Sequence, residues 1–208
     1  MQTYVDLGES AIFIIMALAS VLALAVFVER WIVFRKSISD KSEIFLQNLT
    51  LLLRKRNIPE AKELVIQGED TVYTRFTSYT IERLEENPEG LPDFMQGKIL
   101  SEKIELEKRL PILNTLGNNA PFIGLLGTVL GVIKAFHNLG TLGNTGAEVV
   151  MRSISTALLA TAAGLAIAIP VVMVNNFFSR KMKVILANLE ILSREFLGNF
   201  LSGSSKKH

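Results

Sequence analysis

The sequence predicts an all-α membrane protein with three transmembrane helices and long helices that continue outside the bilayer. Nearly half of the 208 residues are hydrophobic (49%), and only 20% are charged, whereas soluble domains carry about a quarter charged residues. Three long segments contain no charged residue at all, and each is long enough, at ~1.5 Å per residue, to approach or exceed a hydrocarbon layer of about 30 Å. These segments are Ala11–Val28, Leu110–Ile133 and Ser153–Ser179.

The composition also excludes several classes of protein. There are no cysteines, which rules out disulfides, thiolate metal sites and thiol nucleophiles. The two histidines, His137 and His208, are too few for a histidine metal site, and the net charge of +2 is too small to argue for nucleic acid. We therefore expect no metal, no cofactor and no nucleic-acid partner.

The first membrane helix is expected over residues 10–34, after a short segment at 1–9 on the outer side. A cleavable signal peptide would begin with a positively charged region, but residues 1–9 hold Asp6 and Glu9 and neither lysine nor arginine. The apolar run is followed by Arg30 and Trp31, a pattern typical of a helix that stays in the membrane.

Residues 35–109 are expected to form a cytoplasmic segment of several helices. Cap residues and prolines at helix starts divide it, with a turn at Asn87–Gly90. We expect the last of its helices to continue into the second membrane helix with a bend at Pro111. The predicted pieces begin at Asn57–Pro59 and cover Thr71–Glu86 and Leu91–Arg109.

The remaining elements are a second membrane helix, an outer loop, a third membrane helix and a helical tail with a polar end. Lysine and arginine are absent from residues 1–9 and 138–148, but residues 35–109 contain 13 and residues 180–208 contain 6. Because basic residues accumulate on the cytoplasmic side, we expect a periplasmic N-terminus and a cytoplasmic C-terminus. The expected ranges are 110–137 for the second helix, 138–148 for the periplasmic loop, 149–179 for the third helix and 180–208 for the tail.

Small residues recur every three or four positions on the second and third membrane helices. That spacing lets two helix backbones approach closely, and a tightly packed hairpin is as good an interpretation as any functional role for each single residue. Prolines inside these two helices are expected to bend them. The packing residues are Gly124, Gly127, Gly131, Ala160, Gly164 and Ala168, and the prolines are Pro121 and Pro170.

Hydroxyl and amide side chains also lie inside the apolar segments. A helix that faces only lipid has no use for Thr128, Thr156 and Thr161, although such hydroxyls often bond to carbonyls of their own helix. Asparagines lie toward the expected cytoplasmic ends of the same helices, and as a group these polar residues predict an interhelical or wetted interior. None of the three segments contains Asp or Glu, the usual proton carriers in membranes, so a titrating group would have to come from another chain. The asparagines are Asn114, Asn118, Asn119, Asn175 and Asn176.

Two motifs resemble the ExbB/TolQ/MotA family of proton-channel subunits, and the ExbB branch most closely. They are Gly124-Leu-Leu-Gly-Thr-Val-Leu-Gly131 and Ala157-Leu-Leu-Ala-Thr-Ala-Ala-Gly164, followed by Ala168-Ile-Pro170. The resemblance implies a homopentamer around a central pore in the bacterial inner membrane. It also implies two partners: an ExbD-like single-helix protein that brings an aspartate, and a TonB-like protein energised by the motor.

The same resemblance assigns the pore-lining role to Thr128 and Thr161, near the partner aspartate. Thr156 stands where family members often carry glutamate, which makes a carboxylate pathway on this subunit doubtful. The implied function is that of an ion-driven motor subunit rather than an enzyme. A TolQ-like envelope-maintenance motor and a non-conducting scaffold remain alternatives, whereas a flagellar stator would need a fourth helix. Basic residues near the outer interface are expected only to extend toward water, namely Lys134, His137 and Arg152.

Overall fold

The structure is a computed structural model that describes residues 2–38, 41–142 and 147–201, and every regular element in these ranges is a helix. The polar end at 202–208 lies outside the described residues, as does the middle of the expected outer loop. The elements are α1 (Gln2–Ser37), α2 (Ser42–Arg54), α3 (Ile58–Gln67), α4 (Val72–Glu86), α5 (Leu91–Glu107), α6 (Leu110–Leu142), α7 (Ala147–Phe196) and the π-helical turn η2 (Leu197–Leu201).

Three of the described helices, α1, α6 and α7, are long and apolar enough to cross a membrane. The predicted all-α class with three long apolar helices is therefore confirmed, while the pentamer stays a prediction. Helix α6 continues to Leu142 and α7 begins at Ala147, so helix occupies part of the segment 138–148 that was expected to be a loop.

The chain divides into two compact units. Unit 1 consists of residues 1–29 and 109–177, and unit 2 consists of residues 30–108 and 178–208. Helices α1 and α7 each contribute residues to both units.

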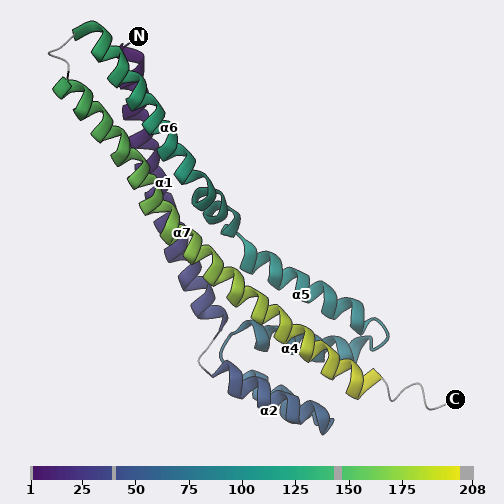
Figure 1. Cartoon of the computed structure of the whole chain (residues 1–208). Helices are drawn as coiled ribbons and strands as arrows, with labels where there is room; N and C mark the ends of the chain where they lie inside the picture. The colour runs from purple at the N-terminus through teal and green to yellow at the C-terminus, as the bar shows by residue number, and fades with distance from the viewer. Residues whose placement is uncertain (1, 39–40, 143–146, 202–208) are drawn as a thin grey trace. The chain divides into compact units, whose positions relative to one another are not determined.

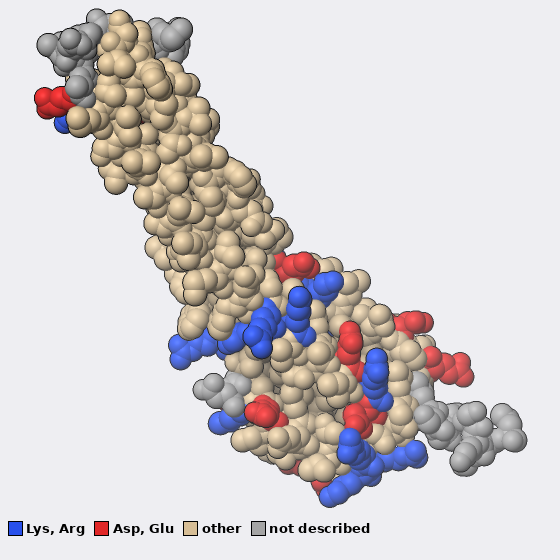
Figure 2. Space-filling view, in the orientation of Figure 1, with Lys and Arg blue, Asp and Glu red and all other residues tan. Residues whose placement is uncertain are grey.

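Unit 1 is a three-helix bundle in which α1, α6 and the first part of α7 run side by side (Figure 1). Ile12 and Met16 of α1 form its core with Ala160 of α7. Many large apolar side chains point outward instead, among them Leu18, Phe122, Leu158 and Met173, and Figure 2 shows no charged side chain along the middle of this unit on the face in view. A surface of this kind suits contact with lipid.

Unit 2 is built from α2 to α5, the end of α1 and the second part of α7. Its core consists of fully buried leucine, isoleucine, methionine and phenylalanine side chains, such as Leu53, Phe76, Met95, Leu189 and Phe196. Figure 2 shows lysine, arginine, aspartate and glutamate side chains mixed over its surface, as expected for a face in water.

Helix starts in unit 2 follow the cap residues of the sequence. The Asn57 side chain accepts a hydrogen bond from the Glu60 amide at 3.3 Å, and Thr71 forms a reciprocal capping box with Thr74. Both satisfy backbone N–H groups that the first helical turn leaves without partners. The predicted starts of α3 and α4 are thereby confirmed.

The bend expected at Pro111 is wrong in its position. Helix α5 ends at Glu107, and α6 begins at Leu110, so the interruption falls on Lys108 and Arg109. Arg109 has a positive φ of 64°, which a non-glycine residue adopts only at a break in regular structure. Pro111 belongs to the first turn of α6, where its missing N–H costs nothing.

Candidate functional site

Helices α6 and α7 meet through their small residues. A methyl group placed on Gly131 would lie 2.4 Å from the Ala157 Cβ, and one on Gly127 would lie 2.6 Å from the Ala160 Cβ. Neither distance leaves room for a side chain larger than hydrogen. The two backbones therefore approach as closely as glycine permits.

The contact extends along α6 toward its start. A methyl group on Gly124 would lie 2.7 Å from the Ala160 carbonyl oxygen, and one on Gly164 would lie 2.7 Å from the Ala120 carbonyl oxygen. Ala168, one turn further along α7, is 3% exposed. All six small residues singled out in the sequence are buried in unit 1.

A hydroxyl joins the two helices at the centre of this contact. The Thr161 Oγ1 donates a hydrogen bond of 3.1 Å to the Gly124 carbonyl oxygen, an acceptor on the other helix. Glycine at position 124 is what lets the Thr161 side chain reach that carbonyl, since the nearest atoms of α7 leave no space for a Cβ.

The other two threonines bond within their own helices. Thr128 Oγ1 donates to the Leu125 carbonyl at 2.6 Å, and Thr156 Oγ1 donates to the Arg152 carbonyl at 3.0 Å. Both side chains are half-buried in the single chain, so their oxygen lone pairs are open to a further partner. Their role in lining a pore stays a prediction.

The two prolines differ in exposure. Pro121 is half-buried in α6 and Pro170 is exposed on α7, and both lie inside their helices. The bend expected at each of them stays a prediction.

Ion pairs mark the two ends of unit 1. Lys134 of α6 contacts Asp6 and Glu9 of α1, at 2.7 Å and 2.8 Å, and at the opposite end Glu29 of α1 pairs with Arg109. A partner for Lys134 is not visible in the sequence, because Asp6 and Glu9 lie more than a hundred residues away along the chain. It does not extend freely to water but holds α1 against α6.

These ion pairs bracket the apolar part of the unit. The part of α1 between Glu9 and Glu29 is ~30 Å long at ~1.5 Å per residue, which equals the ~30 Å of a hydrocarbon core. Between these ion pairs Ile12 lies against Gly127. The order of the three contacts along the two helices shows that α1 and α6 are antiparallel, so each residue of one helix has a counterpart at the same depth on the other. Neither helix carries Asp or Glu between the brackets.

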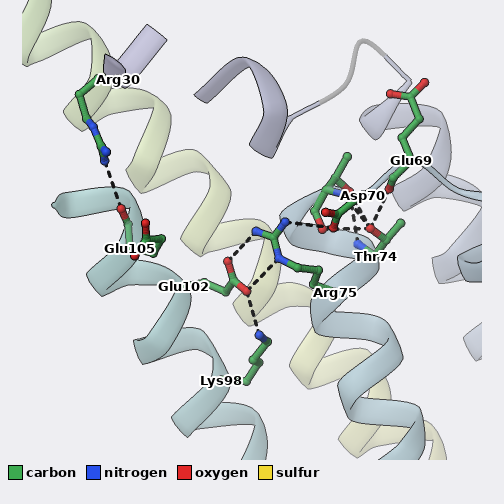
Figure 3. A network of polar contacts seen from close by, with 9 residues as sticks. Arg30, Glu69, Asp70, Thr74, Arg75, Lys98, Glu102 and Glu105 are labelled. Atoms are coloured by element: carbon green, nitrogen blue, oxygen red, sulfur yellow. Dashed lines mark hydrogen bonds and ion pairs between the residues drawn. The ribbon is translucent and has the colours of Figure 1, made fainter. Parts of the chain in front are cut away.

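Unit 2 contains a buried carboxylate that the sequence did not single out. Glu102 of α5 is 5% exposed, and its two oxygens contact Arg75 at 3.0 Å and Lys98 at 2.9 Å (Figure 3). Burial opposes ionisation of this carboxyl, but hydrogen bonds from Arg75 and Lys98 hold its pKa below the ordinary value. Glu102 is therefore a buried charge that joins α5 to Arg75 of α4.

A second buried charge lies at the end of α1 that belongs to unit 2. Arg30 is 1% exposed and donates a hydrogen bond of 3.2 Å to the carbonyl oxygen of Glu105 (Figure 3). Arg30 is therefore a structural link between α1 and α5, although its place after an apolar run suggested only a membrane-flanking residue. Within the described residues no group of three or more His, Cys, Asp or Glu side chains could hold a metal ion.

Three long apolar helices define a polytopic membrane protein. Two of them pack against each other through glycines and carry hydroxyl side chains at or beside that contact. Residues 68–191 match the MotA/TolQ/ExbB proton channel family, and the chain belongs to this family. The match contains both glycine- and threonine-bearing motifs and the α6–α7 contact.

Curated relatives agree with this assignment. The chain is 43% identical over 89 residues to the biopolymer transport protein ExbB of Helicobacter pylori, covering 43% of this chain and 61% of that protein. It is 43% identical over 91 residues to the biopolymer transport protein ExbB of Aquifex aeolicus (44% and 62%). It is 37% identical over 108 residues to the Tol-Pal system protein TolQ of Pseudomonas aeruginosa (52% and 47%). The matched part thus spans about three fifths of the ExbB relatives' length.

Proposed function

We propose that this chain is the ExbB-type subunit of an ion-driven motor of the bacterial inner membrane. In this proposal several copies, five by resemblance, surround an ExbD-like partner helix that carries an aspartate. Protons move through the assembly, and the motor energises a TonB-type protein for outer-membrane transport. The N-terminus is periplasmic and the C-terminus cytoplasmic.

The observation that carries the proposal is the set of threonine hydroxyls at the α6–α7 contact. They lie in the apolar part of unit 1, between its two groups of ion pairs, where lipid offers no hydrogen-bond donor to their oxygen lone pairs. Thr128 and Thr156 retain accessible oxygen lone pairs, and Thr161 fixes the helix pair at the same place. Such oxygens can solvate a proton or a water chain but cannot titrate.

The apolar part of unit 1, between its two groups of ion pairs, contains no acidic side chain, and this supports the proposal that a partner chain supplies one. Since α1, α6 and α7 offer no Asp or Glu there, a proton carrier within the membrane has to be supplied by another chain. An aspartate on a partner helix meets this need, and Thr156 in place of the family glutamate makes the chain more dependent on it.

The experiment is proton flux in proteoliposomes that contain the chain and its single-helix partner. Thr128→Val and Thr156→Val remove a hydroxyl while keeping side-chain shape, and Thr50→Val in α2 is the matched control outside the membrane. We expect the control to retain flux. At least one of the two membrane variants should lose about tenfold or more, since a hydrogen bond to a charged group contributes ~1.5–3 kcal/mol.

Two outcomes would reject the proposal. Flux that is equal in wild type, Thr128→Val, Thr156→Val and liposomes without protein would leave a non-conducting scaffold. Flux that follows a sodium gradient and ignores a proton gradient would reject the proton as the coupling ion. A TolQ-like envelope-maintenance role shares the conducting step and differs in the protein energised, so restoration of outer-membrane integrity rather than of import would favour it.

A further inference from the structure

The start of α6 carries a polar face inside the bracketed part of unit 1. Four side chains of this face are exposed in the chain: Asn114, Thr115, Asn118 and Asn119. They lie on two successive turns of the helix, and none of them belongs to the threonine set described above. They form what we call the amide face of α6.

The ion pairs and contacts of unit 1 fix the depth of the amide face. Arg109 is level with Glu29 of α1, and Gly127 is level with Ile12. Asn118 lies midway between Arg109 and Gly127, so its counterpart on antiparallel α1 is near Val21, in the middle of the apolar run. The amide face thus begins inside the bracket and reaches toward its centre.

The hydrogen bonds of the amide face leave part of its polar groups unused. Asn118 Nδ2 donates to Asn114 Oδ1 at 3.3 Å, and Asn119 Nδ2 donates to the Thr115 carbonyl at 2.8 Å. Within the described ranges, no partner satisfies the side-chain oxygens of Asn118 and Asn119 or the Asn114 amide group. Acyl chains offer none, so a lipid-facing position is strongly unfavourable for this surface.

The exposed residues of α6 change character abruptly after Asn119. The outward positions that follow are apolar, and their exposed fractions stay high: Phe122 67%, Leu125 54%, Leu126 53% and Val129 49%. The polar surface is therefore confined to the end of the helix near Arg109, which is the cytoplasmic end in the proposed orientation.

We propose that the amide face lines a water-filled vestibule at the cytoplasmic end of the ion pathway. This inference rests on the proposed function, because only a conducting protein has an ion pathway for the vestibule to serve. Water satisfies the free amide oxygens and N–H groups that lipid cannot. Because the amide face holds no titratable group, a proton passes it on water, and control of the ion lies deeper, at the threonines and the partner acid.

The chain contains no cysteine, so single-cysteine variants test the vestibule directly. Asn118→Cys places a thiol on the amide face, and Val21→Cys places one on α1 at the same depth, where the side chain is 67% exposed. Asn114→Cys is a second variant of the amide face in case Asn118→Cys fails to assemble. Each is produced with the single-helix partner in inverted vesicles and treated with a charged, membrane-impermeant methanethiosulfonate.

We expect Asn118→Cys and Asn114→Cys to react at least about tenfold faster than Val21→Cys, because only the thiolate reacts and apolar surroundings raise the pKa of a thiol. Equal rates for all three would overturn the proposal. Fast reaction only when the partner is absent would also overturn it, since the amide face would then be covered by the partner helix.

Proton flux of the wild type separates this inference from the proposed function. Fast labelling of the amide face without any flux rejects the motor and keeps the water-filled space. Normal flux with slow labelling keeps the motor and rejects the vestibule.

Discussion

Gly131→Ala tests whether the α6–α7 contact is as tight as the structure shows. The added methyl group would lie 2.4 Å from the Ala157 Cβ, 1.0 Å short of the 3.4 Å at which ordinary van der Waals contact begins. The opposing atom is a Cβ fixed to the backbone, so the conflict cannot be relieved by rotating a side chain. The helices have to separate, and the neighbouring contacts at Gly127 and Gly124 loosen with them.

The magnitude follows from two opposing effects. Inserting a methyl group into a packed interface costs about 1–3 kcal/mol, while alanine in place of glycine gains about 0.5–1 kcal/mol of helix propensity. The net expectation for Gly131→Ala is a loss of about 1 kcal/mol, the middle of the resulting range. That loss corresponds to a melting temperature lower by about 2–4 °C in a protein of this size.

The same helix offers a matched control. Gly140 also lies in α6, but a methyl group there would meet nothing within 4 Å, so Gly140→Ala should be neutral or slightly stabilising. The compensating exchange Gly131→Ala with Ala157→Gly removes the opposing Cβ. The nearest atoms left are the Ala157 Cα at 3.2 Å and the Ser153 carbonyl oxygen at 3.3 Å, so most of the lost stability should return.

The assay is thermal unfolding of the detergent-solubilised protein, followed by circular dichroism and by retention of the oligomer on size exclusion. Our reasoning fails if Gly131→Ala melts at the same temperature as Gly140→Ala. It also fails if the compensating exchange is no more stable than Gly131→Ala, because the Cβ conflict would then not be the cause.

Further predictions concern the ion pairs and one cap. Glu102→Ala leaves Arg75, whose side chain is 38% exposed, with Asp70 as its remaining ion-pair partner, and should cost about 1–3 kcal/mol. Because the folded pKa of Glu102 is lowered, its stabilisation is present above the unfolded pKa and is lost as pH falls through the folded pKa. The difference in free energy of unfolding between wild type and Glu102→Ala, measured with urea, should therefore be smaller at pH 3 than at pH 7. Lys134→Met should lower the melting temperature, and adding Glu9→Gln should recover part of the loss. If the double variant instead loses the sum of the two single losses, Lys134 and Glu9 do not interact directly. Thr71→Ala removes the capping box of α4 and should lower the free energy of unfolding in urea by about 1 kcal/mol. An unchanged urea midpoint would mean that the cap does not stabilise the protein.

The sequence predicted what depends on local pattern. Charge-free length identified the three long helices, and Asn57 and Thr71 marked helix starts because a cap acts within its own first turn. The spacing of Gly124, Gly127 and Gly131 singled out the residues that the structure places at the α6–α7 contact.

Pairings between distant segments could not be predicted in the same way. Lys134 finds Asp6 and Glu9 only once α1 lies antiparallel to α6, and Glu102 is buried only once α4 and α5 pack together. A single sequence shows each of these charges with no sign of its partner. The position of the break before α6 was missed for a related reason, since Pro111 is compatible both with a bend inside a helix and with the first turn of a new one.

The tightness of the α6–α7 contact bears on where an ion can move. Between these two helices of one chain there is no room for a methyl group at Gly124, Gly127 or Gly131, and hence none for water. The half-buried Thr161 hydroxyl donates its proton to the Gly124 carbonyl across that contact and joins the two helices at that depth, while its role in lining a pore stays a prediction. In the function proposed above, the ion therefore passes along the outer surface of the pair, where Thr128 and Thr156 are half-buried, and a second chain closes that surface from the other side. The conducting path of the proposed motor would therefore belong to the assembly and not to a single chain.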